Sequence, residues 1–176
     1  MTLEERMAII EKKAKRNQEN ETKQINSLKA KTEEALQKVE ELAPRIKAVI
    51  CLANKCIEEG IAFPSSWTTA EFGYGNGYRS YDFCADGICH HVGFMNCKRG
   101  CYKNGESPYN KIEYLGIDEG GYCGEWDFYT NGTETFLKHE DNGAIKDAEL
   151  KYLKDFLNEF DVFEKAFYKW IDSLGA

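Results

Sequence analysis

The sequence predicts an α+β fold: a long N-terminal, coiled-coil-like helix, an antiparallel meander sheet of five to six strands, and a C-terminal amphipathic helix rich in aromatic residues. Three observations lead to this class. Residues 1–43 contain neither Gly nor Pro and carry apolar side chains at helical spacing. Short apolar segments separated by Asp-Gly and Asn-Gly follow residue 64. Residues 144–174 then return to helical spacing.

Residues 2–43 are expected to form a helix about 60 Å long, at about 1.5 Å per residue. Leu3, Met7, Ile10 and Ala14 follow a 4-3-4 spacing, which then slips through the nine polar residues 16–24. The seam resumes as Leu28, Thr32, Ala35, Val39, Leu42, Ile46, Val49, Ala53 and Cys56. The polar stretch is the solvated middle of one helix or a place where a hairpin folds back. We favour one helix, because the stretch contains no turn-forming Gly or Pro.

Pro44 is expected to kink this helix or to begin a second one over residues 44–59. Proline lacks a backbone N–H and is tolerated in a first helical turn, where that N–H has no intrahelical partner. Gly60 is a C-terminal stop signal. The chain therefore divides into an N-terminal helical region, residues 1–60, and a compact α+β domain, residues 61–176.

The sheet is expected within residues 65–140, because strand-like segments alternate there with turn signals. Asp86-Gly87 and Asn131-Gly132 are strong hairpin signals, since a type I′ turn needs positive φ at both central residues. The expected strands are 67–72, 78–84, 88–95, 111–118, 122–130 and 133–139. Consecutive hairpins of this kind predict a meander.

The C-terminal helix is expected over residues 144–174, with one apolar face turned to the core. Its stripe consists of Leu153, Phe156, Phe160, Phe163, Phe167, Trp170 and Leu174, widened by Leu157, Ala166 and Ile171. Side chains this large suit packing against a sheet or a helix pair.

The charge distribution argues against a nucleic-acid-binding protein. The net charge is −7, and eight acids in residues 113–141 face only Lys138. Direct binding to nucleic acid needs a basic field instead. The chain begins with charged residues and has no apolar run of about 18 residues, so we expect no membrane contact and a cytoplasmic location.

The seven cysteines are expected to be reduced in such a compartment. With a two-residue turn at Asp86-Gly87, Cys84 falls directly opposite Cys89. Together with Cys97 and Cys101 these residues form a candidate zinc site, although the spacing is wider than usual. Structural thiols are the favoured alternative, and a Cys84–Cys89 disulfide is a third possibility under oxidising conditions.

No catalytic residues are expected, so the chain is predicted not to be an enzyme. His90 and His91 are consecutive in a strand and point to opposite faces, so only one of them could join a cysteine nucleophile. His139 is the third histidine, and no catalytic signature surrounds any of these residues.

The acidic segment is the candidate partner-binding surface. Glu125 and Asp127 share one strand face and alternate with Trp126 and Phe128, which favours a plain solvated face. The functional alternative is an acidic surface that binds a basic protein, and catalysis by the carboxylates is less favoured. The candidate binding residues are Glu113, Asp118, Glu119, Glu125, Asp127 and Glu134.

The chain combines an N-terminal heptad helix with a Tyr/Gly-rich sheet. It is acidic and has no catalytic signature. In these features it resembles small accessory proteins of phages and mobile elements, including anti-CRISPR inhibitors. The resemblance implies a non-enzymatic inhibitor or adaptor that blocks a basic host protein, such as a CRISPR-associated nuclease. The alternatives are an oligomerising structural phage protein, assembled through the N-terminal helix as a homo-oligomer, and a small zinc-stabilised module.

Overall fold

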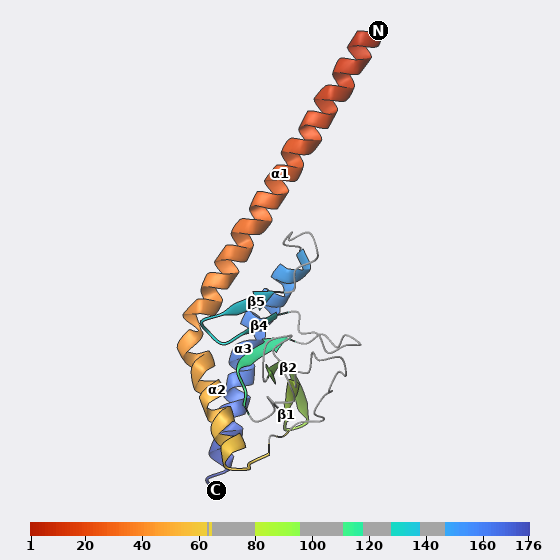
Figure 1. The fold of residues 1–176 in the computed structure, drawn as a ribbon. Helices are drawn as coiled ribbons and strands as arrows, with labels where there is room; N and C mark the ends of the chain where they lie inside the picture. Colours follow the sequence, from red (N-terminus) through yellow and green to blue (C-terminus); the bar gives the residue numbers. More distant parts are fainter. Residues whose placement is uncertain (63, 65–79, 96–110, 118–127, 138–146) are drawn as a thin grey trace, which may run out of the picture.

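The structure, a computed structural model, describes residues 1–62, 64, 80–95, 111–117, 128–137 and 147–176. The predicted α+β class is confirmed (Figure 1). The described elements, in chain order, are α1 (Leu3–Glu41), α2 (Ala43–Glu58), β1 (Ser80–Ala85), β2 (Ile88–Met95), β3 (Tyr114–Ile117), β4 (Phe128–Thr130), β5 (Thr135–Leu137) and α3 (Asp147–Ser173).

α1 is one continuous helix, so the prediction of a single helix over the polar stretch is confirmed and the hairpin alternative is wrong. Thr2 caps its N-terminus in a capping box. The Glu5 backbone N–H donates to Thr2 Oγ1 over 3.2 Å, and the Thr2 N–H donates to Glu5 Oε2 over 2.6 Å. Two otherwise unpaired N–H groups are thereby satisfied at the start of the helix.

α2 begins almost where α1 ends, at the predicted proline. Leu42 separates the two helices, and Pro44 lies in the first turn of α2. The C-terminal stop at Gly60 is also confirmed, with φ of +69°. The Gly60 N–H donates to the carbonyl of Ile57, and the Ile61 N–H donates to that of Cys56. This pair of bonds is a Schellman motif, which favours glycine at its left-handed position.

The described strands form one antiparallel sheet in the order β1-β2-β3-β4-β5, which confirms the predicted meander. The register pairs Cys84 with Cys89, as the Asp86-Gly87 turn predicts. β2 has the predicted bounds, whereas β3, β4 and β5 are shorter than the segments expected for them. The strand predicted at residues 67–72 lies outside the described residues.

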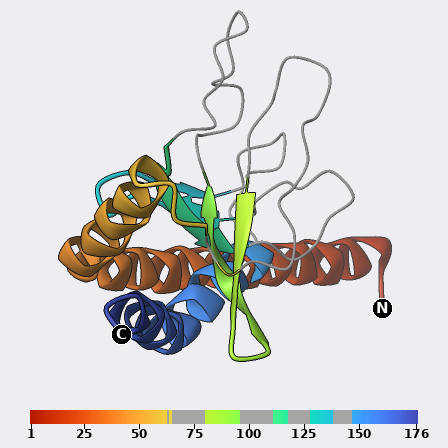
Figure 2. The same ribbon diagram turned by 90° about the horizontal axis from the view of Figure 1, so that it is seen from below.

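The helices gather on one face of the sheet (Figure 2). α3 contacts α1 and strands β1 to β4, and its aromatic stripe forms the centre of the core. Phe83 of β1 meets Phe163 and Phe167 edge-on, with ring centroids 5.8 and 5.7 Å apart. Trp170 and Ile171 are only partly buried, and Leu174 is exposed. The predicted stripe of α3 is fully buried at Leu153, Phe156, Phe160, Phe163 and Phe167.

A second, smaller cluster lies on the opposite face of the sheet. Met95 and Tyr114 are buried there, with Tyr129 and Phe136 packed beside them. Alternating side chains of β3 and β4 thus serve two different cores, as the pleat of a strand requires.

Candidate functional site

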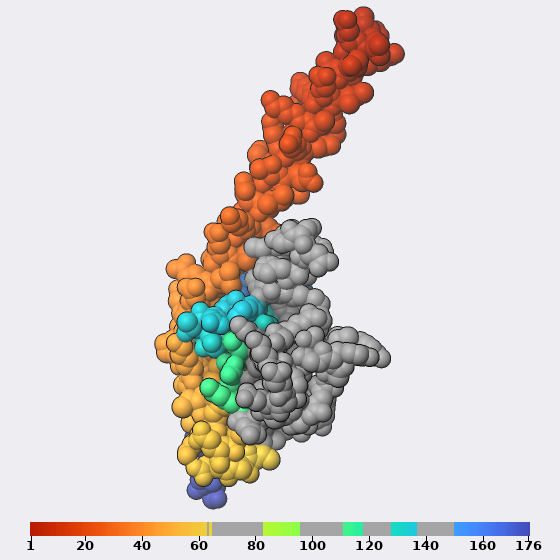
Figure 3. All heavy atoms as spheres, viewed as in Figure 1, coloured from red at the N-terminus to blue at the C-terminus, as the bar shows by residue number. Residues whose placement is uncertain are grey.

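The N-terminal half of α1 extends well beyond the rest of the described chain (Figures 1 and 3). Every residue from 3 to 27 is exposed, including Leu3 at 74% and Ile10 at 68%. The resumed seam behaves in the opposite way. Leu28 and Leu42 are partly buried, and the other predicted seam residues are buried: Thr32, Ala35, Val39, Ile46, Val49, Ala53 and Cys56.

The exposed and the buried parts of the seam lie on the same face of α1. Successive residues of a helix are rotated by about 100° around its axis. On this basis, the side chains of Leu3, Met7, Ile10 and Ala14 point on average within about 20° of the covered seam residues of α1, which are Leu28, Thr32, Ala35 and Val39. We name these four residues the α1 stripe. Ile9 is also exposed, at 55%, but points to the other side of the helix. The stripe is therefore a continuation of a packing face beyond the point where this chain covers it.

A groove lies where α1 begins to pack against α3. Its volume is about 630 Å³, and its lining includes Gln24, Ile25, Leu28 and Lys31 of α1 and Leu150 of α3. Leu28 is partly buried and Leu150 is buried, whereas Ile25 is 62% exposed. The groove thus offers apolar side chains next to the inner end of the exposed half of α1.

Four of the six candidate acidic residues, Asp118, Glu119, Glu125 and Asp127, lie outside the described residues. Glu113 and Glu134 are described, and the structure brings both near one side chain, Tyr114. The pKa of Tyr114 is raised to about 12, first by burial and then by the negative charges of Glu134 and Glu113.

Glu134 itself is exposed in the turn between β4 and β5, which is built by local hydrogen bonds. The Asn131 side-chain oxygen accepts from the N–H groups of Thr133 and Glu134 over 2.8 and 2.6 Å. A turn does lie at the predicted Asn-Gly, with φ of +87° at Gly132, but Thr130 pairs with Thr135, so the loop has four residues and is not the two-residue turn that the sequence predicted. This turn holds one candidate acid at a defined place on the surface.

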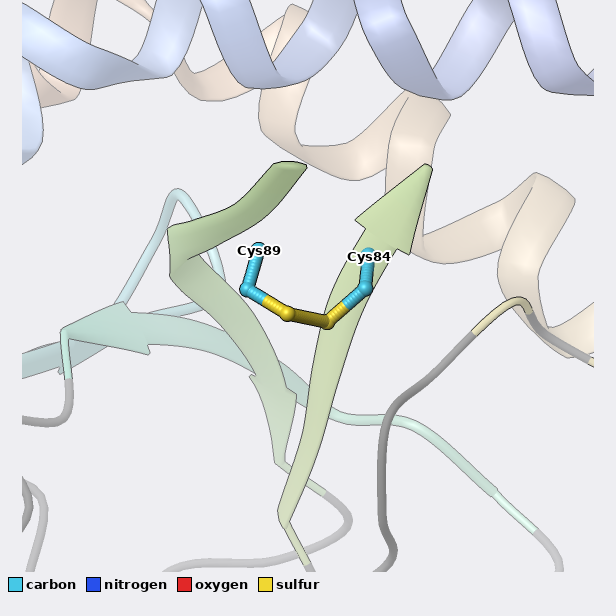
Figure 4. Close-up of a disulfide and its surroundings, with 2 residues drawn as sticks. All are labelled: Cys84 and Cys89. Carbon is cyan, nitrogen blue, oxygen red and sulfur yellow. A yellow bond between two sulfur atoms is a disulfide. The ribbon is translucent and has the colours of Figure 1, made fainter. Parts of the chain in front are cut away.

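Cys84 and Cys89 form a disulfide across the β1–β2 hairpin (Figure 4). The expectation of reduced thiols is wrong for this pair. The physical reason is the register, because directly opposite residues of an antiparallel pair bring their Cβ atoms within about 4.5–5.5 Å. Sulfurs joined in a disulfide are not thiolate ligands, so in this state the pair offers no donors for the predicted zinc site.

The other two candidate zinc ligands, Cys97 and Cys101, lie outside the described residues. Cys51 and Cys56 are free thiols on α2, the first exposed and the second buried. Burial raises the pKa of the Cys56 thiol. Within the part of the chain that the structure describes, no three His, Cys, Asp or Glu side chains are grouped as metal ligands.

His90 and His91 both reach α3, at Phe163 and Glu159, beside a shift in the β1–β2 register between Asp82 and Cys84. His90 is half-buried next to the rings of Phe83 and Phe163, with centroids 5.7 and 6.2 Å away. Burial lowers its pKa. His91 is exposed, and its Nδ1 lies 3.3 Å from Glu159 Oε1 on α3. His90 therefore packs as a core-edge ring, and His139 lies outside the described residues.

Two polar contacts that the sequence analysis missed attach α2 to its neighbours. Arg45 Nη2 donates to Glu164 Oε1 over 2.7 Å, and its guanidinium lies 5.1 Å from the Phe160 ring centroid. Asn54 forms two hydrogen bonds with the backbone of Ile112, ahead of β3. The partners are separated by 119 and 58 residues, so no local spacing reveals them.

No protein-family model matches this chain, and neither a curated protein nor a solved structure matches it significantly. None of the described helices combines the length and the apolar character that crossing a bilayer requires.

Proposed function

We propose that this chain is a non-enzymatic protein-binding protein, an adaptor or inhibitor, that uses the exposed half of α1 as its main contact. One observation carries the proposal. The α1 stripe has the same spacing and the same direction as the buried face that packs against α3, yet it is exposed. Large apolar side chains in line on a projecting helix are typical of helical recognition elements, which anchor through positions three and four residues apart.

The energetics favour a partner on this stripe. Burying a Leu, Ile or Met side chain stabilises a complex by about 1.5–3 kcal/mol. Leu3, Met7 and Ile10 retain at least half of their surface in contact with solvent, so most of that stabilisation is not realised within the chain. Charged residues such as Arg6 and Glu11 flank the stripe and supply the polar rim that protein interfaces usually have.

The acidic surface is proposed as a second contact, with a basic host protein. Glu113 and Glu134 lie near Tyr114, which belongs to the smaller cluster of the sheet, and the chain carries a net charge of −7. Such a surface suits a basic channel that otherwise holds nucleic acid, because complementary charge sets the rate and specificity of association. A CRISPR-associated nuclease is one target of this kind, in keeping with the resemblance noted above.

The test is a nuclease-treated pull-down with tagged full-length protein, identified by mass spectrometry. The double variant Met7→Ser/Ile10→Ser should lose the proteins that the unchanged chain captures, including untagged copies of the chain itself. Ile9→Ser is the matched control, because Ile9 is similarly exposed but points away from the stripe. Equal capture by all three proteins would refute a binding role for the α1 stripe.

The acidic contact is tested separately with Glu113→Lys/Glu134→Lys. Loss of a basic protein from this variant would support the acidic surface as a second contact with that protein. Retention of every captured protein would remove the acidic surface from the proposal.

A further inference from the structure

We propose that the α1 stripe binds the α1 stripe of a second copy of this chain, with the two helices antiparallel. The first turn of each helix then docks beside the groove at Leu28 and Leu150 of the other copy. This inference rests on the proposed function, in which the stripe is a protein contact, and it specifies the partner. A stripe that binds its own copy forms a two-fold symmetric interface, the commonest arrangement among protein dimers.

The position of the compact part of the molecule favours the antiparallel arrangement. The α1 stripe and the face that packs against α3 point to the same side of α1, and the compact part lies on that side (Figure 1). Paired helices lie about 8–10 Å apart. In a parallel dimer, the two compact parts would meet at the same height across that gap and collide. An antiparallel dimer places them at opposite ends.

The register follows from where the helix becomes covered. Leu28 is the first partly buried residue of the seam, so the overlap between the two helices ends there. Setting Leu3 level with Leu28 of the second copy also sets Ala14 level with Asn17. The overlap then spans residues 3–28, about 37 Å at 1.5 Å per residue. Nearly four heptads overlap in this way, with apolar seam residues near the two ends and polar residues in the middle.

Apolar contacts concentrate at the two ends of this overlap. Leu3 meets Leu28 near the groove that Leu150 also lines, and Met7 lies one turn further along, level with Gln24 and beside Ile25. Between the ends, Ile10 lies level with Glu21 and Ala14 with Asn17, so polar residues occupy the central part of the seam. Polar residues in a seam reduce stability but specify register and orientation. Because each end occurs twice, the dimer buries two apolar clusters.

The flanking charges are compatible with this register. Glu4 of one copy and Lys29 of the other lie on the same flank, two residues or about 3 Å apart along the helix axis. The two-fold symmetry repeats this pair. On the opposite flank, Arg6 and Lys13 face the uncharged Ser27 and Asn20. No like charges face each other at these positions, and flanking charges are what set orientation in paired helices.

The first experiment measures the dimer dissociation constant of the purified full chain by analytical ultracentrifugation. Met7→Ser/Ile10→Ser should raise it by at least about a hundredfold, because apolar contacts are lost at both symmetry-related ends. Ile9→Ser, on the other side of the helix, should leave it unchanged. Circular dichroism checks that each variant keeps its helix content.

The second experiment tests orientation with a charge exchange. Glu4→Lys and Lys29→Glu should each weaken the dimer roughly tenfold, since two exposed pairs are reversed. The double variant should recover the original affinity. Within one chain, and between parallel copies, these residues are about 37 Å apart, so only antiparallel pairing predicts recovery.

The outcomes separate this inference from the proposed function. A chain that is monomeric at every concentration overturns the dimer, while loss of a captured host protein on Met7→Ser/Ile10→Ser would still support the stripe as a protein contact. A dimer unaffected by that double variant overturns the dimer through the stripe, and unchanged capture of other proteins by the same variant overturns the proposed function as well. A dimer in which the charge exchange shows no recovery overturns the antiparallel arrangement.

Discussion

Gly132, in the turn between β4 and β5, lies directly against Ala43, the first residue of α2. A Cβ added at Gly132 would come within 3.0 Å of both the Cα and the carbonyl oxygen of Ala43. The junction between α1 and α2 is thus packed against a hairpin that is nearly ninety residues away in the sequence. Gly132 also has φ of +87°, a conformation that L side chains rarely adopt.

Gly132→Ala should therefore destabilise the protein by about 2–3 kcal/mol, from backbone strain and from displacement of the helix junction. Urea unfolding followed by circular dichroism measures this. The control is Gly87→Ala, where φ is +78° but nothing lies within 4 Å of the added Cβ. It should cost only the strain, about 1–2 kcal/mol. Equal losses in the two variants would show that the contact with Ala43 contributes nothing.

Asn54 attaches α2 to the segment that enters β3. Its Nδ2 donates to the Ile112 carbonyl over 2.8 Å, and its Oδ1 accepts from the Ile112 N–H over 2.6 Å. Asn54→Ala should cost about 1–3 kcal/mol, because buried Ile112 loses both partners. Asn158→Ala on the exposed side of α3 should change the urea midpoint very little. A small effect of Asn54→Ala would mean that water replaces both bonds.

Tyr114 should make the protein sensitive to alkaline pH. Its folded pKa is raised to about 12, above an ordinary value of about 10. The stability it contributes is therefore fully present below pH 10 and is lost as the pH rises from 10 to about 12. Between pH 10 and 12, the free energy of unfolding of Tyr114→Phe should therefore fall by about 1–3 kcal/mol less than that of the unchanged protein. Urea unfolding at a series of pH values measures this difference.

A second variant tests the cause of this pKa. Glu134→Gln should lower the pKa of Tyr114, which ultraviolet absorbance of the phenolate detects as an earlier titration step. Glu33→Gln, an exposed acid on α1, is the control and should not move that step. An unchanged titration in Glu134→Gln would show that Glu134 does not contribute to the raised pKa.

The cysteines should differ in reactivity towards iodoacetamide. Cys51 is an exposed thiol and should be alkylated in the native protein, whereas Cys56 is buried with a raised pKa and should react only after unfolding. Cys84 and Cys89 should react only after reduction. Peptide mapping by mass spectrometry distinguishes the sites. Rapid native alkylation of Cys56 would show that α2 opens easily.

Much of the fold follows from local patterns. Spacing alone predicts the features that depend on a few adjacent residues. These are the α1 seam, the break at Pro44, the stop at Gly60 and the turns at Asp-Gly and Asn-Gly. The opposition of Cys84 and Cys89 follows in the same way from the length of one turn. The ends of β3, β4 and β5 do not follow from local patterns, because packing decides how far each strand extends.

The sequence by itself determined that α1 carries one repeating apolar seam, but only the tertiary structure decided which part of it is covered. The two halves of the seam have the same spacing, and spacing carries no information about where α3 ends. The contacts of Arg45, Asn54 and Gly132 were decided in the same way, since their partners approach only when distant segments pack. The order of residues specifies which face of a helix or strand is apolar. Whether that face is buried depends on which other parts of the folded chain pack against it.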